Sequence, residues 1–150
     1  MSSPGQPRLI DPRGHRFGAA FSVVLLVLAF IIGQPIIVAA VAVALGVSAW
    51  FGTRYSALGR PWPYVRRVFH IGPPAELEIE WPPRFAQAIG FLVLSAASFL
   101  FLAGLPTLAW LFTAAVAVLQ TLLAAAGYCL GCRLYFLSWK APILFRRLAR

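Results

Sequence analysis

The chain has two cysteines, Cys129 and Cys132, separated by two residues in the stretch GYCLGC. A dithiol with this spacing can close a disulfide or resolve a mixed disulfide with another protein, and its reactivity depends on the thiolate fraction. The pair could also supply two ligands to a metal ion, or two small apolar side chains packed between helices. Redox or sulfur-transfer chemistry, metal binding and packing are therefore all compatible with the spacing.

Metal binding would need ligands besides the two cysteines, because structural zinc sites have four. The chain has two histidines, His15 and His70, and they lie far apart in the sequence. One CxxC with two scattered histidines is a weak metal signal. We therefore predict no metal and no cofactor.

The redox interpretation depends on how the backbone runs through the cysteine motif. If a helix breaks at Gly131, Cys132 and Arg133 begin a new helix. The thiol would then lie at a helix N-terminus beside a guanidinium group, and both favour the thiolate. On this basis we predict that Cys132 is the more nucleophilic thiol, Cys129 the resolving thiol and Arg133 the group that stabilises the thiolate. Without the break, the dipole at a helix C-terminus would oppose ionisation.

The composition decides the class of protein that carries this motif. Hydrophobic residues make up 61% of the 150 residues and charged residues only 11%. No charge falls between Phe17 and Thr53 or between Phe85 and Cys132. Each gap is long enough for two crossings of a bilayer at about 20 helical residues per crossing. This pattern excludes an ordinary water-soluble domain.

Breaker residues divide each apolar stretch into two, at Gly33-Gln34-Pro35 and at Gly104-Leu105-Pro106. Backbone amides cannot stay unpaired in lipid, and apolar runs without alternation favour helices over a barrel. We predict an all-α membrane protein that forms a single domain over residues 1–150. Its four transmembrane helices form two hairpins and span approximately residues 17–33, 35–52, 85–103 and 106–128.

The two hairpins resemble each other in sequence, which indicates an internal duplication. DPRGHRFGAA precedes the first span and WPPRFAQAIG begins the third, so Arg16 and Phe17 match Arg84 and Phe85. Two helices per copy return the chain to its starting side, which makes the copies parallel repeats. In the same alignment SALGRP, after the second helix, falls within one residue of YCLGCR. Only the second copy carries thiols.

The basic residues predict the orientation. All 13 lysines and arginines lie in the N-terminal tail, in the loop 53–84 or after the fourth span. The positive-inside rule then places both termini and this loop in the cytoplasm of a bacterial plasma (inner) membrane. The same bias accounts for the net charge of +9, so no nucleic-acid partner is predicted. The cysteines would face the cytoplasm, where a static disulfide would be reduced.

Two segments flank the cytoplasmic ends of the predicted helices. Residues 54–70 and the C-terminal segment 132–150 interleave aromatic residues with arginine and lysine. This pattern is typical of interfacial helices at lipid headgroups, and it would also suit an acidic soluble partner. Within the spans, Gln87 and Gln120 are expected to form hydrogen bonds between helices, and faces rich in alanine and glycine could support a homo-oligomer.

The stretches IDPRGHRF, GPPAELE, PPRFAQAIG and GYCLGC together resemble a bacterial family of small four-helix membrane proteins of unknown function that end in a CxGC motif. The resemblance covers about Ile10 to Tyr135. It implies a link to thiol or sulfur chemistry, with a thioredoxin-like or sulfurtransferase protein as the partner. It carries over Cys129 and Cys132 together with framework residues, namely Asp11, Arg13, Arg16, Arg84 and Phe85.

The sequence therefore predicts a membrane protein whose cytoplasmic dithiol exchanges electrons or sulfur with a soluble thioredoxin-like partner. An alternative from another class is a non-enzymatic membrane subunit or small-solute channel in which the cysteines only pack. A channel needs polar groups that face a common cavity, whereas thiol chemistry needs reactive sulfur. The sequence alone leaves open whether the protein is an enzyme.

Overall fold

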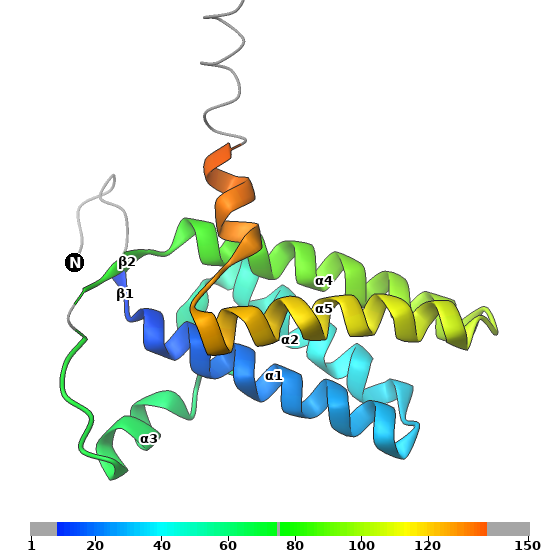
Figure 1. Ribbon diagram of the computed structural model, residues 1–150, viewed down its shortest axis with the longest axis horizontal. Coiled ribbons are helices and arrows are strands. Elements are labelled where there is room, and N and C mark those ends of the chain that lie inside the picture. The colour runs from blue at the N-terminus through cyan, green and yellow to red at the C-terminus, as the bar shows by residue number, and fades with distance from the viewer. Residues whose placement is uncertain (1–8, 75, 138–150) are drawn as a thin grey trace, which may run out of the picture.

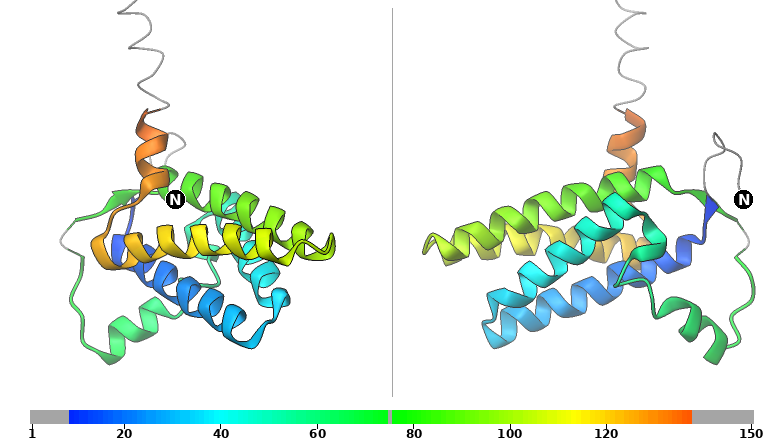
Figure 2. Two further views of the ribbon diagram at one scale, coloured as in Figure 1. Left: turned by 45° about the vertical axis from the view of Figure 1, so that its right-hand side comes forward. Right: turned by 180° about the vertical axis from the view of Figure 1, so that it is seen from behind.

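The computed structural model describes residues 9–74 and 76–137 and contains four long helices (Figure 1). These are α1 (Pro12–Ile32), α2 (Pro35–Phe51), α4 (Trp81–Leu102) and α5 (Pro106–Ala126). Helix α1 packs against α2 and α5, and α4 packs against the same two helices. The two hairpins therefore form one four-helix bundle, with α2 and α5 on opposite faces (Figure 2).

Both predicted Gly-x-Pro turns are present. Gly33 ends α1 with a φ of 66°, and Gly104 follows α4 with a φ of 75°. Glycine adopts this left-handed conformation without a steric penalty. Pro35 and Pro106 then begin α2 and α5, where the fixed φ of proline suits the first helical turn.

Three of the four helices are long and apolar enough to cross a membrane: α1, α4 and α5, with 21, 22 and 21 residues. Helix α2 is also apolar, with 17 residues. Large apolar side chains on these helices point outward, including Phe30, Ile31, Ile36, Phe99 and Leu102. The predicted all-α membrane class is confirmed at this level, and the outer surface suits contact with lipid.

Small residues bring the helices close together around a core of aliphatic side chains, including Leu26, Val38, Leu45 and Leu94. A Cβ atom placed on Gly46 in α2 would lie 2.8 Å from the ring of Phe91 in α4. Two residues further along α2, Ser48 donates a hydrogen bond to Gln87 Oε1 of α4 over 2.5 Å. The expected bond between helices is therefore confirmed for Gln87. Gln120 makes no side-chain hydrogen bond with any other residue that the structure describes.

Two arginines make equivalent contacts across the bundle. Arg16 of α1 donates to the carbonyl oxygens of Ala124 and Ala125 at the end of α5, each over 3.0 Å. Arg84 of α4 donates to Ala49 O and Trp50 O at the end of α2, over 2.9 and 2.7 Å. Carbonyls in the last helical turn lack partners within the helix. Each hairpin thus satisfies the carbonyls of the other with a matched arginine.

The glycines after α2 and α5 also follow the predicted repeat. A Cβ on Gly18 would lie 3.5 Å from the backbone nitrogen of Gly59. At the matched place in the second copy, a Cβ on Gly131 would lie 2.6 Å from the Cβ of Ala86. In each hairpin, this contact holds the segment that follows the second helix against the first helix of that hairpin.

The remaining elements gather at the end of the bundle opposite the two turns (Figure 1). The loop after α2 contains the 3-10 helix η1 (Thr53–Tyr55) and the short helix α3 (Trp62–Val68). Strand β1 (Leu9–Ile10) pairs antiparallel with β2 (Glu78–Ile79), a pairing that the sequence analysis did not predict. Residues 130–137 form a further helix, whereas residues 138–150 of the predicted interfacial segment lie outside the described residues.

Candidate functional site

The cysteine motif begins where α5 ends. Gly127 follows Ala126 with a φ of 67°, and its N–H bonds back to Leu123 O over 3.0 Å. Residues 127–129 are not helical, and the helix resumes at Leu130. The break therefore comes before Cys129 and not at Gly131, because Gly127 is the residue that adopts the left-handed conformation.

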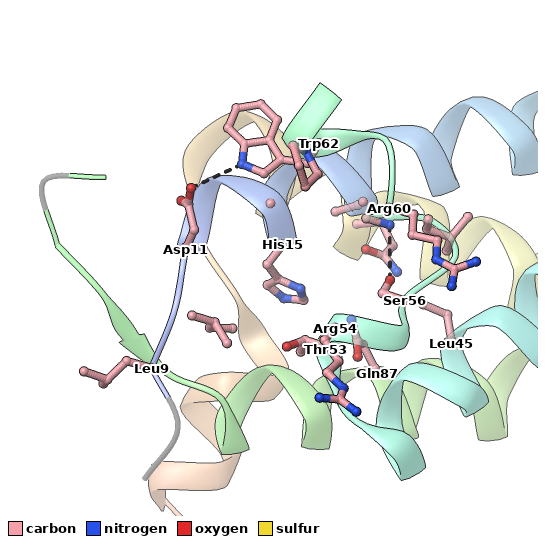
Figure 3. A pocket seen from close by; sticks show the side chains of 18 residues that line it. Leu9, Asp11, His15, Leu45, Thr53, Arg54, Ser56, Arg60, Trp62 and Gln87 are labelled. Carbon is pink, nitrogen blue, oxygen red and sulfur yellow. Dashed lines mark hydrogen bonds between the residues drawn. The ribbon is translucent and has the colours of Figure 1, made fainter. Parts of the chain in front are cut away.

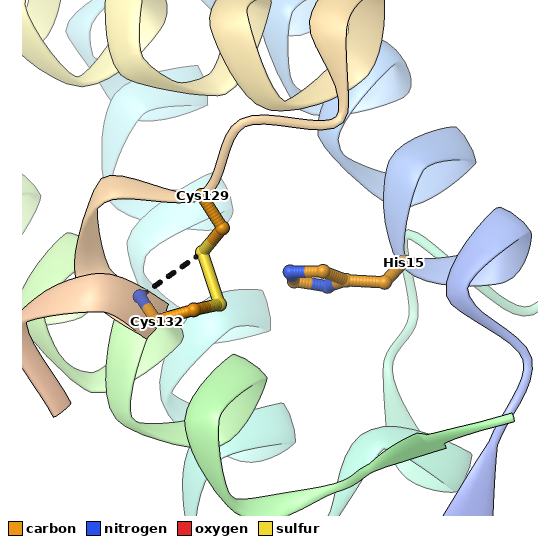
Figure 4. Close-up of side chains that lie close together, drawn as sticks. All are labelled: His15, Cys129 and Cys132. Atoms are coloured by element: carbon orange, nitrogen blue, oxygen red, sulfur yellow. Dashed lines mark hydrogen bonds between the residues drawn. A yellow bond between two sulfur atoms is a disulfide. The ribbon is translucent and has the colours of Figure 1, made fainter. Parts of the chain in front are cut away.

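Cys129 and Cys132 form a disulfide, with their Cα atoms 5.2 Å apart. Cys129 occupies the position just before the first residue of the helix 130–137. From there its Sγ accepts a hydrogen bond from the backbone N–H of Cys132 over 3.2 Å (Figure 4). The carbonyl of Cys129 accepts from the N–H of Arg133, also over 3.2 Å. Cys129 thus caps the helix N-terminus with its sulfur.

The sequence analysis expected the helix N-terminus to stabilise the thiolate of Cys132, but in the structure it lies at Cys129. The N-terminal N–H groups and the positive end of the helix dipole face Cys129 Sγ, because the helix starts two residues earlier than expected. Arg133 lies over the ring of Tyr128, 4.6 Å from its centre. Its guanidinium makes no hydrogen bond to either sulfur among the described residues. The geometry gives Arg133 a cation–π contact.

His15 is the residue that the fold adds to the two cysteines. One ring nitrogen of His15 and the sulfurs of Cys129 and Cys132 all lie within 4.8 Å of one another. The imidazole points from α1 toward the disulfide (Figure 4). Its Nε2 atom is buried and has no hydrogen-bond partner in the described part of the chain. A buried ring nitrogen without a partner beside a disulfide can accept or donate the proton of a thiol.

The start of α1 holds His15 in this position. Asp11 caps the helix, and its Oδ1 accepts the N–H of Arg13 over 2.9 Å. The other oxygen of Asp11 accepts Trp62 Nε1–H over 3.2 Å and lies 3.8 Å from Arg66. The predicted framework residue Asp11 therefore ties the first turn of α1 to α3, and α1 carries His15 one turn further on.

The structure brings together only some of the metal ligands considered from the sequence. His15 joins the two cysteines, whereas His70, which is exposed after α3, is not part of this group. Three ligands leave a structural zinc site one short of four. Among the described residues, the cluster fits disulfide chemistry assisted by imidazole better than a closed metal site.

Three cavities meet at His15, and two of them reach the cysteines. One has a volume of about 800 Å³ and is lined by Cys129, Cys132 and charged residues, namely Arg13, Arg16, Glu76, Glu78 and Arg133. We call it the polar cavity. Another, of about 160 Å³, lies between α4, α5 and the helix 130–137 and is lined by Cys129 and mostly apolar side chains. We call it the apolar cavity. Cys129 therefore borders both cavities.

The third cavity, of about 360 Å³, lies between α1 and the loop after α2 (Figure 3). The N–H of Gly59 donates to Ser56 Oγ over 3.2 Å at its edge. Glu80, which is buried, accepts hydrogen bonds from the N–H and the hydroxyl of Thr53 over 2.8 and 2.9 Å. These contacts fix the loop against the bundle, so Glu80 serves structure, whereas Glu76 and Glu78 face the polar cavity.

The sequence could not place His15 beside the thiols, because residues more than 100 positions apart meet only through the packing of α1 on α5. The one available signal was the predicted topology, which puts the start of the first span and the end of the fourth on the same side.

No curated protein and no solved structure matches the chain. A family model does match it over residues 10–140, which confirms the resemblance seen in the sequence. The chain belongs to the family described as a domain of unknown function, DUF4395.

Proposed function

We propose that this protein is a four-span protein of a bacterial inner membrane whose Cys129–Cys132 pair exchanges electrons with a soluble protein at the cytoplasmic surface. The observation that carries the proposal is the disulfide at a helix N-terminus with the His15 imidazole beside it. Static disulfides are rare in the cytoplasm, where those that occur are mostly catalytic or redox-sensing.

Helix α2 supports a fourth crossing. Its 17 residues span about 26 Å at about 1.5 Å per residue, close to the ~30 Å hydrocarbon core. It also packs between α1 and α4, two helices long enough to cross. The tight turn at Gly33 joins the N-terminal end of α2 to the C-terminal end of α1, and Arg84 near the start of α4 binds carbonyls at the C-terminal end of α2, so α2 runs the length of the bundle.

The orientation follows from the positions of the arginines. Arg16 and Arg84 lie near the starts of α1 and α4 and Arg133 lies in the helix after α5, so all three are at the end of the bundle opposite the two short turns, which contain no basic residue. Under the positive-inside rule this end faces the cytoplasm. The polar cavity would then open to cytoplasmic proteins.

The proposed reaction starts in the polar cavity, which Cys132 lines. A thiolate of the partner attacks Cys132 Sγ, the bond between the two cysteines breaks, and its electron pair remains on Cys129. The N–H of Cys132 and the helix N-terminus stabilise that thiolate, and a better stabilised thiolate leaves faster. The buried, neutral His15 imidazole beside it can relay a proton to it from the polar cavity, which His15 also lines. A second partner thiolate releases Cys132, so the partner leaves as a disulfide and the pair is reduced.

The reverse sequence would reduce the partner, and it starts from a Cys132 thiolate with Cys129 as the resolving thiol. A sulfane sulfur carried by Cys132 as a persulfide would be resolved in the same way. The proposal keeps the roles that the sequence analysis assigned to Cys132 and Cys129, but the helix N-terminus stabilises the thiolate of Cys129, the resolving residue, and not that of Cys132 as expected. Arg133 lines the polar cavity and would contact the partner. A thioredoxin-like or sulfurtransferase protein with an acidic face would suit the arginines there.

The test is to trap the pair in native membranes with a maleimide before and after mild oxidation. Wild-type protein should show a reversible intramolecular disulfide. Cys129→Ser should accumulate a mixed disulfide through Cys132, and Cys132→Ser, the matched control, should accumulate much less. Cysteines that label only after denaturation would instead favour the alternative, a non-enzymatic subunit or channel in which they only pack.

A further inference from the structure

The apolar cavity lies on the other side of Cys129 from the polar cavity. Its lining is mostly aliphatic, with Ile89, Val93, Val116, Leu119, Leu123 and Leu134. Leu119 on the apolar helix α5 and Leu130 and Leu134 on the helix 130–137 line it and are exposed. A ligand could therefore enter from lipid between α4, α5 and the helix 130–137.

Three polar side chains face this apolar space: His15, Gln87 and Gln120. Nε2 of His15 has no partner among the described residues. Gln87 uses its oxygen for Ser48, which leaves its amide N–H groups, and Gln120 makes no side-chain hydrogen bond in the described part of the chain. Buried polar groups are costly unless they are hydrogen-bonded. Amide and imidazole N–H groups in an apolar cavity therefore fit a flat, apolar ligand that carries carbonyl acceptors.

The reduced thiol pair needs an acceptor for two electrons. We propose that the apolar cavity binds the ring of an isoprenoid quinone, which accepts two electrons and two protons and dissolves in lipid. The inference rests on the proposed thiol function and names the acceptor for it. Ring carbonyls would accept hydrogen bonds from Gln120 and Gln87, and the isoprenoid tail would leave the cavity past the exposed leucines.

The reaction balances with the groups in place. Two S–H bonds break and one S–S bond forms between Cys129 and Cys132, while the two quinone oxygens gain two electrons and two protons to give the quinol. His15 borders both the thiols and the cavity, so it can carry a thiol proton to a quinone oxygen. Cys129 borders both cavities and Cys132 lines the polar one. Electrons therefore pass from a soluble thiol in the polar cavity to the quinone through the pair.

The test uses the full chain in lipid nanodiscs, reduced with dithiothreitol, freed of reductant and kept anaerobic. Decylubiquinone is added, because its fully substituted ring cannot form adducts with thiols. We expect one quinol for each disulfide, followed by quinone absorbance and by thiol counting. Ala115→Trp would fill the cavity and should slow the oxidation at least tenfold. Ala114→Trp, on an exposed residue outside the cavity lining, is the matched control and should oxidise at the wild-type rate.

A second variant reports on binding alone. Gln120→Leu removes one hydrogen bond to the ring, so the Kd for decylubiquinone should rise about tenfold. If quinone leaves the dithiol reduced, or if Ala115→Trp is oxidised as fast as wild type, the quinone site is overturned. A pair that still exchanges with dithiothreitol in that experiment leaves the thiol function intact. A pair inert toward both dithiothreitol and diamide would refute the thiol function and the quinone site together.

Discussion

The contact between Gly131 and Ala86 docks the helix 130–137 against α4, and it leads to a prediction whose size follows from the structure. A Cβ on residue 131 would lie 2.6 Å from Ala86 Cβ and 2.8 Å from its Cα. Carbon atoms pack best at about 3.5–4.0 Å, so the Gly131→Ala variant must move the helix away by about 1 Å. The backbone of α4 cannot yield as a flexible side chain would.

Overpacking of this kind costs about 1–3 kcal/mol. A cost of about 2 kcal/mol would raise the population of undocked helix about 30-fold. Amide hydrogen exchange over residues 130–137 reports this population directly, and protection there should fall about 30-fold while the four long helices keep theirs. The rate of exchange with a soluble dithiol should also fall, because the displaced helix carries the sulfurs away from His15.

Two further variants make the prediction specific. Adding Ala86→Gly to Gly131→Ala should restore only part of the protection and of the rate, because it removes the 2.6 Å contact with Ala86 Cβ but leaves the Cα of residue 86 at 2.8 Å. Gly72→Ala meets nothing within 4 Å and serves as the control. Unchanged protection in Gly131→Ala, or no recovery in the double variant, would refute this account of how the site is held.

Two other predictions concern the imidazole and the paired arginines. His15→Leu should slow thiol exchange at neutral pH about tenfold or more, because proton transfer to the sulfur is lost, while circular dichroism should show unchanged helix content. The control, His70→Leu at an exposed position, should leave the rate unchanged. Equal rates in the two variants would argue against a role for the imidazole. Arg16→Met and Arg84→Met should each lower the free energy of unfolding by about 1–2 kcal/mol, because each removes charged hydrogen bonds to helix-end carbonyls. Urea or thermal unfolding in detergent measures this loss, and a loss confined to one of the two variants would contradict their equivalence.

Much of the fold could be predicted because its determinants are local. Gly33 and Gly104 mark turns that only glycine adopts easily, and the prolines after them start helices. The absence of charge between Phe85 and Cys132 identifies a helical pair in the same way. The similarity around Arg16 and Arg84 predicted matched positions, and the two arginines make matched contacts.

The site could be predicted only in part, because its geometry depends on packing. The cysteines were identified from their spacing, but the start of their helix depends on whether Gly127 or Gly131 adopts the left-handed conformation, and both are glycines. Gly127 does so, which moves the helix N-terminus to Cys129. The position of His15 beside the sulfurs depends on α1 packing against α5, and no local pattern encodes that contact.

A redox titration of the Cys129–Cys132 pair in membranes, against glutathione buffers of known potential, tests the central claim most directly. A pair that exchanges electrons with soluble proteins should titrate reversibly as a two-electron couple, within the range of about −270 to −120 mV found for thiol–disulfide oxidoreductases. A pair that stays oxidised below about −300 mV behaves as a structural disulfide. That result, or thiols that never form the disulfide, would contradict the account.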